Sequence, residues 1–286
     1  MNVEWLRYFV AIAETLNLQA AADRLHVTPQ AVSKALAGLE ASYKARLIDR
    51  DRRIRGLTPA GEILLAEARA VVAALDNTER RLAEARSGAP QGPVTLAGDG
   101  LWHHYLLPPL LTALARQHPM LRPKLYEMLQ DDAERHVAEG QVDLGLLLRA
   151  PSRNDLEWFE GLATPYVIAG RPELQGHWTS LGYIVPRFFN RPLETSLDGW
   201  PETRYPRRIV AEVELLETAI HLAEAGLGAA FLPALALRDR LVRGSLAIVA
   251  EAPCAFEDRL FVVWRKGVRP TPAARAVLDA LKAAEG

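Results

Sequence analysis

The first part of the chain contains three short stretches in which apolar residues recur every three or four positions, the spacing of one face of a helix. The first two stretches are Leu6–Ala13 and Leu18–Leu25. Thr28 and Pro29 then predict the start of a third helix, because a hydroxyl can cap a helix and proline fits its first turn. This third helix has two contrasting faces, an apolar one of Val32, Ala35, Leu36 and Leu39 and a polar one of Gln30, Ser33, Lys34 and Ala37.

Two small residues, Ala21 and Ala22, would let the second and third helices cross closely, which predicts a helix-turn-helix with the polar face of the third helix outward. Its side chains suit DNA. The amide of Gln30 can bond adenine through two atoms, Ser33 can bond a base or a phosphate, and Lys34 can reach guanine or backbone oxygens. The free N–H groups at the start of this helix favour a phosphate. A plain packing unit with a solvated outer face is the alternative.

A basic segment follows the third predicted helix. Residues 1–58 carry nine Lys and Arg against six Asp and Glu, although the whole chain holds 34 against 35. Residues 46–57 can form a short β-ribbon, or wing, in which Arg52, Arg53 and Arg55 would neutralise phosphates and make the affinity fall with salt. An ordinary exposed basic turn is the alternative. A basic end on a near-neutral chain indicates a nucleic-acid module joined to a different domain.

One long helical pattern begins at Pro59, with Thr58 as its N-cap, and continues to residue 86. Its apolar positions are separated alternately by four and three residues, the heptad spacing of helices that pair. Packing on its own domain is the alternative. Pairing would make a homodimer and supply the second recognition helix that a two-fold operator needs. The seam consists of Leu64, Ala68, Val71, Leu75, Thr78, Leu82 and Ala85.

Beyond the Gly- and Pro-rich stretch 87–93, strand-like apolar runs alternate with helical patterns, as in an α/β domain. Ligands of such domains bind where the strands end and helices begin. The first part predicts strands at Val94–Ala97, Lys124–Met128 and Asp143–Leu148, with helices at Trp102–Gln117 and Asp131–Glu139. The second part predicts strands at Gly182–Val185, Arg208–Glu212 and Ala229–Leu232, and helices near Arg187–Asn190, at Leu215–Ala225 and from Thr271 to Ala284.

Several segments, taken together in order and spacing, resemble the LysR-type transcriptional regulator family. They are Leu6–Ala11, Ala21–Thr28, Ala31–Lys34, Leu39–Glu40 and Leu57–Gly61, with a weaker likeness at Tyr105–Leu110, Gly140–Gly145 and Ala225–Pro233. The resemblance implies a winged helix-turn-helix, a linker helix for dimers, and a two-lobed α/β effector domain like a periplasmic binding protein. Such proteins commonly form homotetramers on double-stranded DNA, and a small molecule in the cleft alters transcription.

The resemblance also suggests domain boundaries. We expect a DNA-binding domain at 1–58, a linker and dimerisation helix at 59–88 and an effector-binding domain at 89–286. Within the effector domain, lobe I would take about 93–162 and 262–286, and lobe II about 163–261.

Single positions carry the family's DNA contacts. Thr28, Pro29, Gln30, Ser33 and Lys34 fall where the family contacts DNA, and Arg53, with Arg52 beside it, falls in the wing. Three departures affect the wing's shape: Lys44 where Gly is usual, Ile48 where Phe is usual, and Arg55 in place of an apolar residue.

Asp99 is the most informative departure in the effector domain, because the family more often has Ser or Thr there and commonly contacts the effector. A carboxylate would repel a simple acid, so we expect a neutral or cationic effector, with Trp102 as an apolar or cation–π wall. Asp99 as a helix cap is the alternative, and Arg149 could instead bind an acid. The candidate effector contacts are Asp99, Leu101, Trp102, His103, Arg149, Pro186 and Arg187.

Other chemistry finds little support. His103 and His104 are adjacent and make a poor chelating pair, and a lone Cys254 allows no internal disulfide, so we expect no metal and no cofactor. No nucleophile elbow or phosphate loop indicates an enzyme. The start of the chain lacks the pattern of a signal peptide and no apolar run spans a bilayer, so we expect a cytoplasmic protein without membrane contact. A cytoplasmic small-molecule binding protein of the same two-lobed fold, without sequence-specific regulation, is the alternative function.

Overall fold

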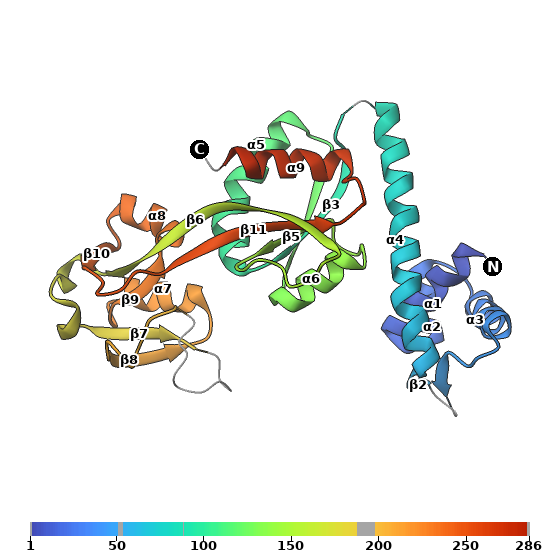
Figure 1. Cartoon of the computed structure of the whole chain (residues 1–286), viewed down its shortest axis with the longest axis horizontal. Coiled ribbons are helices and arrows are strands. Elements are labelled where there is room, and N and C mark those ends of the chain that lie inside the picture. The colour runs from blue at the N-terminus through green and yellow to red at the C-terminus, as the bar shows by residue number, and fades with distance from the viewer. Residues whose placement is uncertain (1, 51–53, 88, 188–197, 285–286) are drawn as a thin grey trace.

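The structure is a computed structural model that describes residues 2–50, 54–87, 89–187 and 198–284. A small helical domain at the N-terminus, one long helix and a two-lobed α/β domain follow one another along the chain (Figure 1). The described residues of the small domain form α1 (Val3–Thr15), α2 (Leu18–Leu25), α3 (Pro29–Tyr43), β1 (Ile48–Arg50) and β2 (Ile54–Leu57).

The apolar faces predicted for these three helices form the core of the small domain. Phe9 and Ile12 of α1 pack with Leu36 and Leu39 of α3, and all four are at most 1% exposed. Ala21 of α2 is fully buried in the same cluster. Its small side chain allows the close approach of helices that the sequence predicts.

Each of these helices ends on a left-handed residue that is not glycine. The φ angles are 49° at Leu16, 55° at His26 and 50° at Lys44. The N–H of Lys44 donates to the carbonyl groups of Glu40 and Ala41, which closes the last turn of α3. A left-handed backbone favours glycine, and this accounts for the glycine that related sequences place at this turn.

The predicted β-ribbon is present, with β1 antiparallel to β2 and Ile48 opposite Leu57. Its tip, which contains the predicted contacts Arg52 and Arg53, lies outside the described residues. Two hydrogen bonds of Thr58 connect the start of the ribbon with the helix that follows it. The Oγ1 atom of Thr58 donates to the carbonyl of Arg46 at 2.6 Å and accepts from the N–H of Gly61 at 3.0 Å.

The long helix α4 (Pro59–Ser87) uses different faces for different contacts. Leu64 and Ala68 pack into the core of the small domain. The predicted heptad seam is therefore wrong in its first two positions, which the protein's own domain covers. Farther along the same seam, the side chains of Val71 and Leu82 are 44% and 60% exposed. A separate face, containing Ala73, lies against the α/β domain.

Lobe I contains parallel strands with helices on both faces, as predicted. Its elements are β3 (Gly92–Gly98), a π-helical turn Trp102–Leu106, α5 (Leu107–Gln117), β4 (Leu121–Glu127), α6 (Gln130–Ala138), β5 (Leu144–Leu147) and α9 (Pro272–Ala283). β3 lies between β4 and β5. The predicted helix 102–117 is present as one continuous helical run that begins with the π-helical turn, and Pro108 and Pro109, which lack backbone N–H groups, lie in the first turn of its α-helical part.

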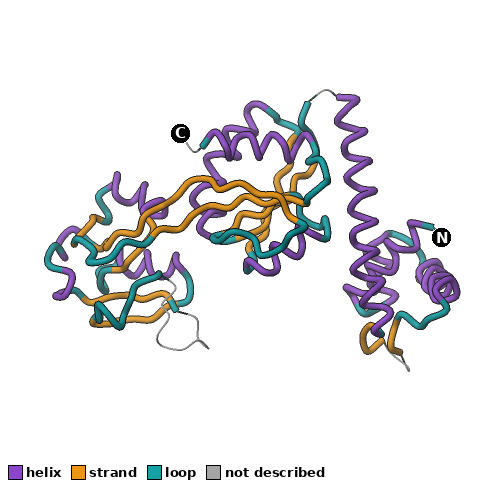
Figure 2. Tube along the Cα trace, viewed as in Figure 1, coloured by secondary structure: helices purple, strands orange, loops and turns teal. Residues whose placement is uncertain are grey.

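Two long antiparallel strands, β6 (Leu156–Gly170) and β11 (Glu257–Arg265), run from one lobe into the other (Figure 2). The sequence pattern predicts neither of them. Lobe II adds β7 (Gly182–Pro186), β8 (Arg208–Val213), α7 (Leu216–Glu224), β9 (Ala230–Pro233), α8 (Ala234–Arg243) and β10 (Ala247–Ala250), with short 3-10 turns at Pro172–Leu174 and Trp178–Ser180. Most of the helix predicted near Arg187–Asn190 lies outside the described residues.

Side-chain packing joins the two lobes as well. One apolar cluster contains Leu96 and Leu106 of lobe I together with Ile220 and Leu232 of lobe II. The hydroxyl of Tyr105 in lobe I also donates to the carboxylate of Glu217 at the start of α7. These contacts hold the lobes in one arrangement while β6 and β11 connect them covalently.

Candidate DNA interface and effector cleft

The outer face of α3 is polar and unobstructed in this chain. Gln30, Ser33 and Lys34 are all exposed, and none of them makes a hydrogen bond or ion pair with another described residue. The opposite face is held in the core by Val32 and Leu36, which are at most 1% exposed. The three polar side chains therefore project together from one helix.

Two more predicted contacts lie at the start of α3. Oγ1 of Thr28 accepts a hydrogen bond of 3.2 Å from the N–H of Ala31, and Pro29 is the first residue of the helix. The helix N-terminus, with the positive end of its dipole, thus lies beside the polar face. The predicted residues Thr28, Pro29, Gln30, Ser33 and Lys34 form one continuous surface.

In the effector domain, Asp99 comes directly after β3, at the ends of the parallel strands. Its Oδ1 accepts a hydrogen bond of 2.8 Å from the N–H of Leu101, so it caps the following turn. Burial raises the pKa of Asp99, and the negative charge of Glu127 raises it further. A buried carboxyl group that is already short of solvent is a poor neighbour for a second anion.

A second partly buried acid, Asp258 at the start of β11, lies in the same electrostatic environment. Burial raises its pKa to about 6; the hydrogen bond that it accepts from the hydroxyl of Tyr166, at 2.7 Å, opposes this shift, and the charge of Asp99 adds to it. Asp99 also raises the pKa of Tyr166. Sequence reasoning missed Asp258 and Tyr166, because they meet only through the pairing of β6 with β11.

The other predicted effector residues differ in how far their side chains reach solvent. Trp102 is fully buried, and its indole N–H donates to the carbonyl of Leu147 at 3.2 Å. The prediction of Trp102 as a cleft wall is therefore wrong in this arrangement, because the ring belongs to the core of lobe I. Leu101 is likewise only 4% exposed. Arg149 is exposed near the end of β5, and its carbonyl accepts from Gln130.

His103 and the lobe II residues are also engaged in the fold. His103 is 7% exposed, and burial lowers its pKa to about 4, so its ring is neutral. Pro186 is buried at the end of β7. Arg187 is 11% exposed and lies 3.0 Å from Glu212 and 3.7 Å from Glu202, which neutralise its charge. No group of three potential metal ligands occurs among the described residues.

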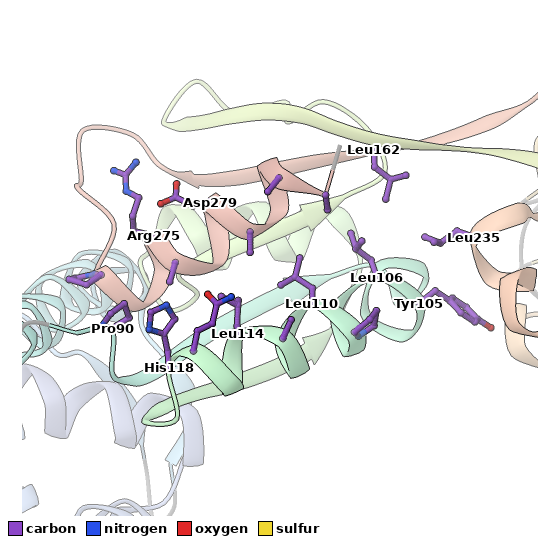
Figure 3. A pocket seen from close by; sticks show the side chains of 18 of the residues that line it. Pro90, Tyr105, Leu106, Leu110, Leu114, His118, Leu162, Leu235, Arg275 and Asp279 are labelled. Atoms are coloured by element: carbon purple, nitrogen blue, oxygen red, sulfur yellow. The ribbon is translucent and has the colours of Figure 1, made fainter. Parts of the chain in front are cut away.

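A pocket of about 850 Å³ lies between α5 and α9 in lobe I (Figure 3). Leu110 and Leu114 line its apolar floor, and Leu235 of lobe II lies at one end, beside Tyr105. Neither Asp99 nor the predicted lobe II residues line it. This pocket is therefore separate from the strand ends where the sequence predicts the effector.

Comparison with known proteins identifies both parts of the chain. A model of the bacterial regulatory helix-turn-helix protein, lysR family, matches residues 3–62, and a model of the LysR substrate binding domain matches residues 87–286. The chain belongs to the LysR family of transcriptional regulators. It is a LysR-type regulator with a helix-turn-helix DNA-binding domain and an effector-binding domain.

Individual LysR-type relatives match over nearly the whole length. The HTH-type transcriptional regulator IlvR of Caulobacter vibrioides is 29% identical, with 93% of each chain covered. A crystal structure of full-length CbnR complexed with its target DNA has a TM-score of 0.67 at 22% identity and covers 99% of each chain. Full-length LysG of Corynebacterium glutamicum with bound effector Arg has a TM-score of 0.62 at 20% identity and covers 98% of each chain.

The fold of this LysR-type regulator is thus that of its solved neighbours. No helix in the described part of the chain has both the length and the hydropathy that crossing a membrane requires.

Proposed function

We propose that this LysR-type regulator recognises a specific operator through the outer face of α3. Gln30, Ser33 and Lys34 would contact base edges and nearby phosphates, with Thr28 and Pro29 placing a phosphate at the helix N-terminus. The observation that carries this proposal is that these side chains are exposed on one face of α3 and make no hydrogen bond or ion pair with other described residues. Arg52 and Arg53 of the wing would add phosphate contacts.

A gel-shift titration of the full chain against DNA from upstream of its own gene tests this proposal. We expect binding in the nanomolar range that weakens at least about tenfold between 50 and 200 mM salt, because neutralised phosphates release counterions. Competition with unrelated DNA should displace the protein poorly. Weak binding that is indifferent to sequence would contradict the proposal and favour a small-molecule binding protein of the same fold.

We further propose that the chain dimerises through α4. Val71 and Leu82 are large apolar side chains exposed to solvent on one side of this helix, and Leu75 lies on the same seam. Replacing Val71 and Leu75 by Glu would place charges in the contact and should give smaller assemblies in light scattering. An unchanged mass would remove α4 from the interface.

A homotetramer needs a second contact, for which the edge strands of the effector domain are suited. Leu125 and Tyr126 are exposed on β4, at one edge of the large sheet, and Ile209 and Val210 are exposed on β8. Exposed apolar edge strands are ready-made pairing surfaces. We therefore propose a homotetramer. We also propose that the protein is cytoplasmic and that it acts as a regulator and not as an enzyme.

The effector would bind between the lobes, where Asp99 lies at the ends of the strands. Two partly buried acids, Asp99 and Asp258, make that region unfavourable for an anion and favourable for a cation or a hydrogen-bond donor. A solved neighbour, LysG, holds the effector Arg, which shows that this fold can take a cationic ligand. We propose an amine-bearing or neutral effector for this chain, with Arg149 as the group that could still contact a carboxylate.

A further inference from the structure

Arg69 in the middle of α4 lies where the DNA-binding domain, the linker helix and the effector domain meet. Its Nη2 is 3.5 Å from Oε1 of Glu14, at the end of α1, and its Nη1 is 3.5 Å from Oε2 of Glu139, directly after α6 in lobe I. The three side chains are only 19–25% exposed. One guanidinium therefore bridges two carboxylates that belong to different domains.

The surrounding contacts make this junction specific. The side-chain amide of Gln141 has hydrogen-bond partners for both its oxygen and its nitrogen in one of its two orientations. In that orientation the oxygen accepts from Nε of Arg69 at 2.9 Å and the nitrogen donates to Glu139 at 3.3 Å. One helical turn farther along α4, Ala73 faces Gly140, and a Cβ added to Gly140 would lie 2.9 Å from the Cβ of Ala73. Lobe I thus lies close to α4 beside the bridge.

Neither carboxylate depends on Arg69 alone. Arg24 lies 2.6 Å from Glu14 within the DNA-binding domain, and Arg135 lies 3.9 Å from Glu139 within lobe I. Loss of Arg69 would therefore leave both acids with a cation and both domains folded. What it would remove is a cation that contacts both domains at once, because a planar guanidinium can serve two carboxylates and a neutral side chain cannot.

We propose that Arg69 is a positioning residue that holds the effector domain in a defined orientation relative to the DNA-binding domain, and so transmits movement of lobe I to the recognition helices. This rests on the proposed function. Ion pairs of 3.5 Å at partly exposed side chains are weak enough to be made or broken when an effector favours one arrangement of the lobes. When lobe I rearranges, Glu139 moves with it. Because Arg69 contacts both Glu139 and Glu14, the ion pair that restrains α1 changes as well.

Distance measurements between spin labels test this on the full chain. We would place labels at two exposed positions, Ala20→Cys in α2 and Arg116→Cys in α5, in a Cys254→Ser background. Labelled chains are diluted with unlabelled chains so that distances within one chain are read. We expect a single distribution for this parent protein and one that is about twofold broader for Arg69→Ala, because the approach of Ala73 to Gly140 alone restrains the domains less than it does together with the bridge.

Further variants distinguish coupling from general destabilisation. Glu139→Gln should broaden the distribution in the parent but add nothing in the Arg69→Ala background, and Arg69→Lys should restore part of the narrowing. Arg135→Ala is the matched control, since it removes a cation near Glu139 that does not touch α4, and it should leave the distribution narrow. An Arg69→Ala distribution as narrow as the parent, or equal broadening by Arg135→Ala, would overturn the proposal.

Gel shifts on the same proteins separate a failure of this proposal from a failure of the proposed function. If the parent protein binds no DNA sequence specifically, the proposed function is wrong. The role of the Arg69 bridge is judged only by the spin-label distances.

Discussion

Asp99 and Leu101 form a closed hydrogen-bonded turn at the ends of the parallel strands, with 2.8 Å between Oδ1 of the aspartate and the backbone nitrogen of the leucine. The carboxylate has a second oxygen that can still accept, and Asp258 contributes a further buried acid to the same electrostatic environment. The cap and an effector contact are therefore compatible roles for Asp99.

We predict that amines, and not simple organic acids, stabilise the chain in a thermal-shift screen. An amine at a partly buried carboxylate gains a charge-assisted hydrogen bond of about 1.5–3 kcal/mol, so Asp99→Ser should weaken amine binding by about tenfold or more. Asp239→Ser, at an exposed position on α8 that does not line the pocket, is the control and should leave the amine response unchanged. Stabilisation by acids alone, insensitive to Asp99→Ser, would refute a cationic effector.

Lys44 offers a test of the backbone at the end of the recognition helix. It holds a φ of 50°, which a residue with a Cβ adopts at a cost of about 1 kcal/mol and glycine adopts freely. Lys44→Gly should therefore raise the local stability of α3 by about 1 kcal/mol, although glycine usually weakens helices. Hydrogen exchange of the α3 amides measures it. Ala41→Gly, three residues earlier inside the helix, should lower the same protection by about 1 kcal/mol. Faster exchange in both variants would contradict a left-handed Lys44.

His103 should make the protein sensitive to acid. Burial lowers its pKa to about 4, whereas an unfolded histidine titrates near 6.5. Between these values the unfolded chain binds more protons, so the contribution of His103 is complete above pH 6.5 and is lost as the pH falls towards 4. Asp258, whose pKa is raised to about 6, has the opposite sign and favours the folded state more as the pH falls.

The variant His103→Phe isolates the histidine from Asp258, because Asp258 is present in both proteins. Between pH 7.5 and 5 the parent should lose up to about 2 kcal/mol of unfolding free energy relative to the variant, measured by urea unfolding. The exposed His221→Gln should behave like the parent. If parent and His103→Phe lose stability in parallel, the buried ring does not carry the acid response.

How much of this molecule is predictable from its sequence depends on how local each feature is. The helices of the DNA-binding domain are predictable because apolar spacing and caps such as Thr28 act within a few residues. The long strands β6 and β11 are not, since Phe159 and Pro165 interrupt the alternation of β6 and the paired residues lie about a hundred positions apart, as with Glu157 and Trp264. Their pairing is set by tertiary contacts.

The candidate sites divide in the same way. The polar face of α3 follows from helical geometry, and its predicted side chains do lie together on the surface. The effector region depends on strands from distant parts of the chain, so Asp258 and Tyr166 have no local signal. Trp102 was misplaced for the same reason: its nearness to Asp99 in sequence gives no sign that its indole is buried and donates to the carbonyl of Leu147, 45 residues away.

The base preference of the recognition helix is the sharpest test of the proposal that α3 reads the operator. Selection of binding sites from a pool of randomised DNA, followed by affinity measurement, should give the parent protein a defined two-fold site. Gln30→Ala should then lose about 1–3 kcal/mol of discrimination at one base pair in each half-site, while Lys34→Ala weakens binding to all sites and flattens the salt dependence. Gln19→Ala, an exposed glutamine on α2, should change neither. If Gln30→Ala selects the same site with the same affinity as the parent, α3 does not read the DNA and the account is wrong.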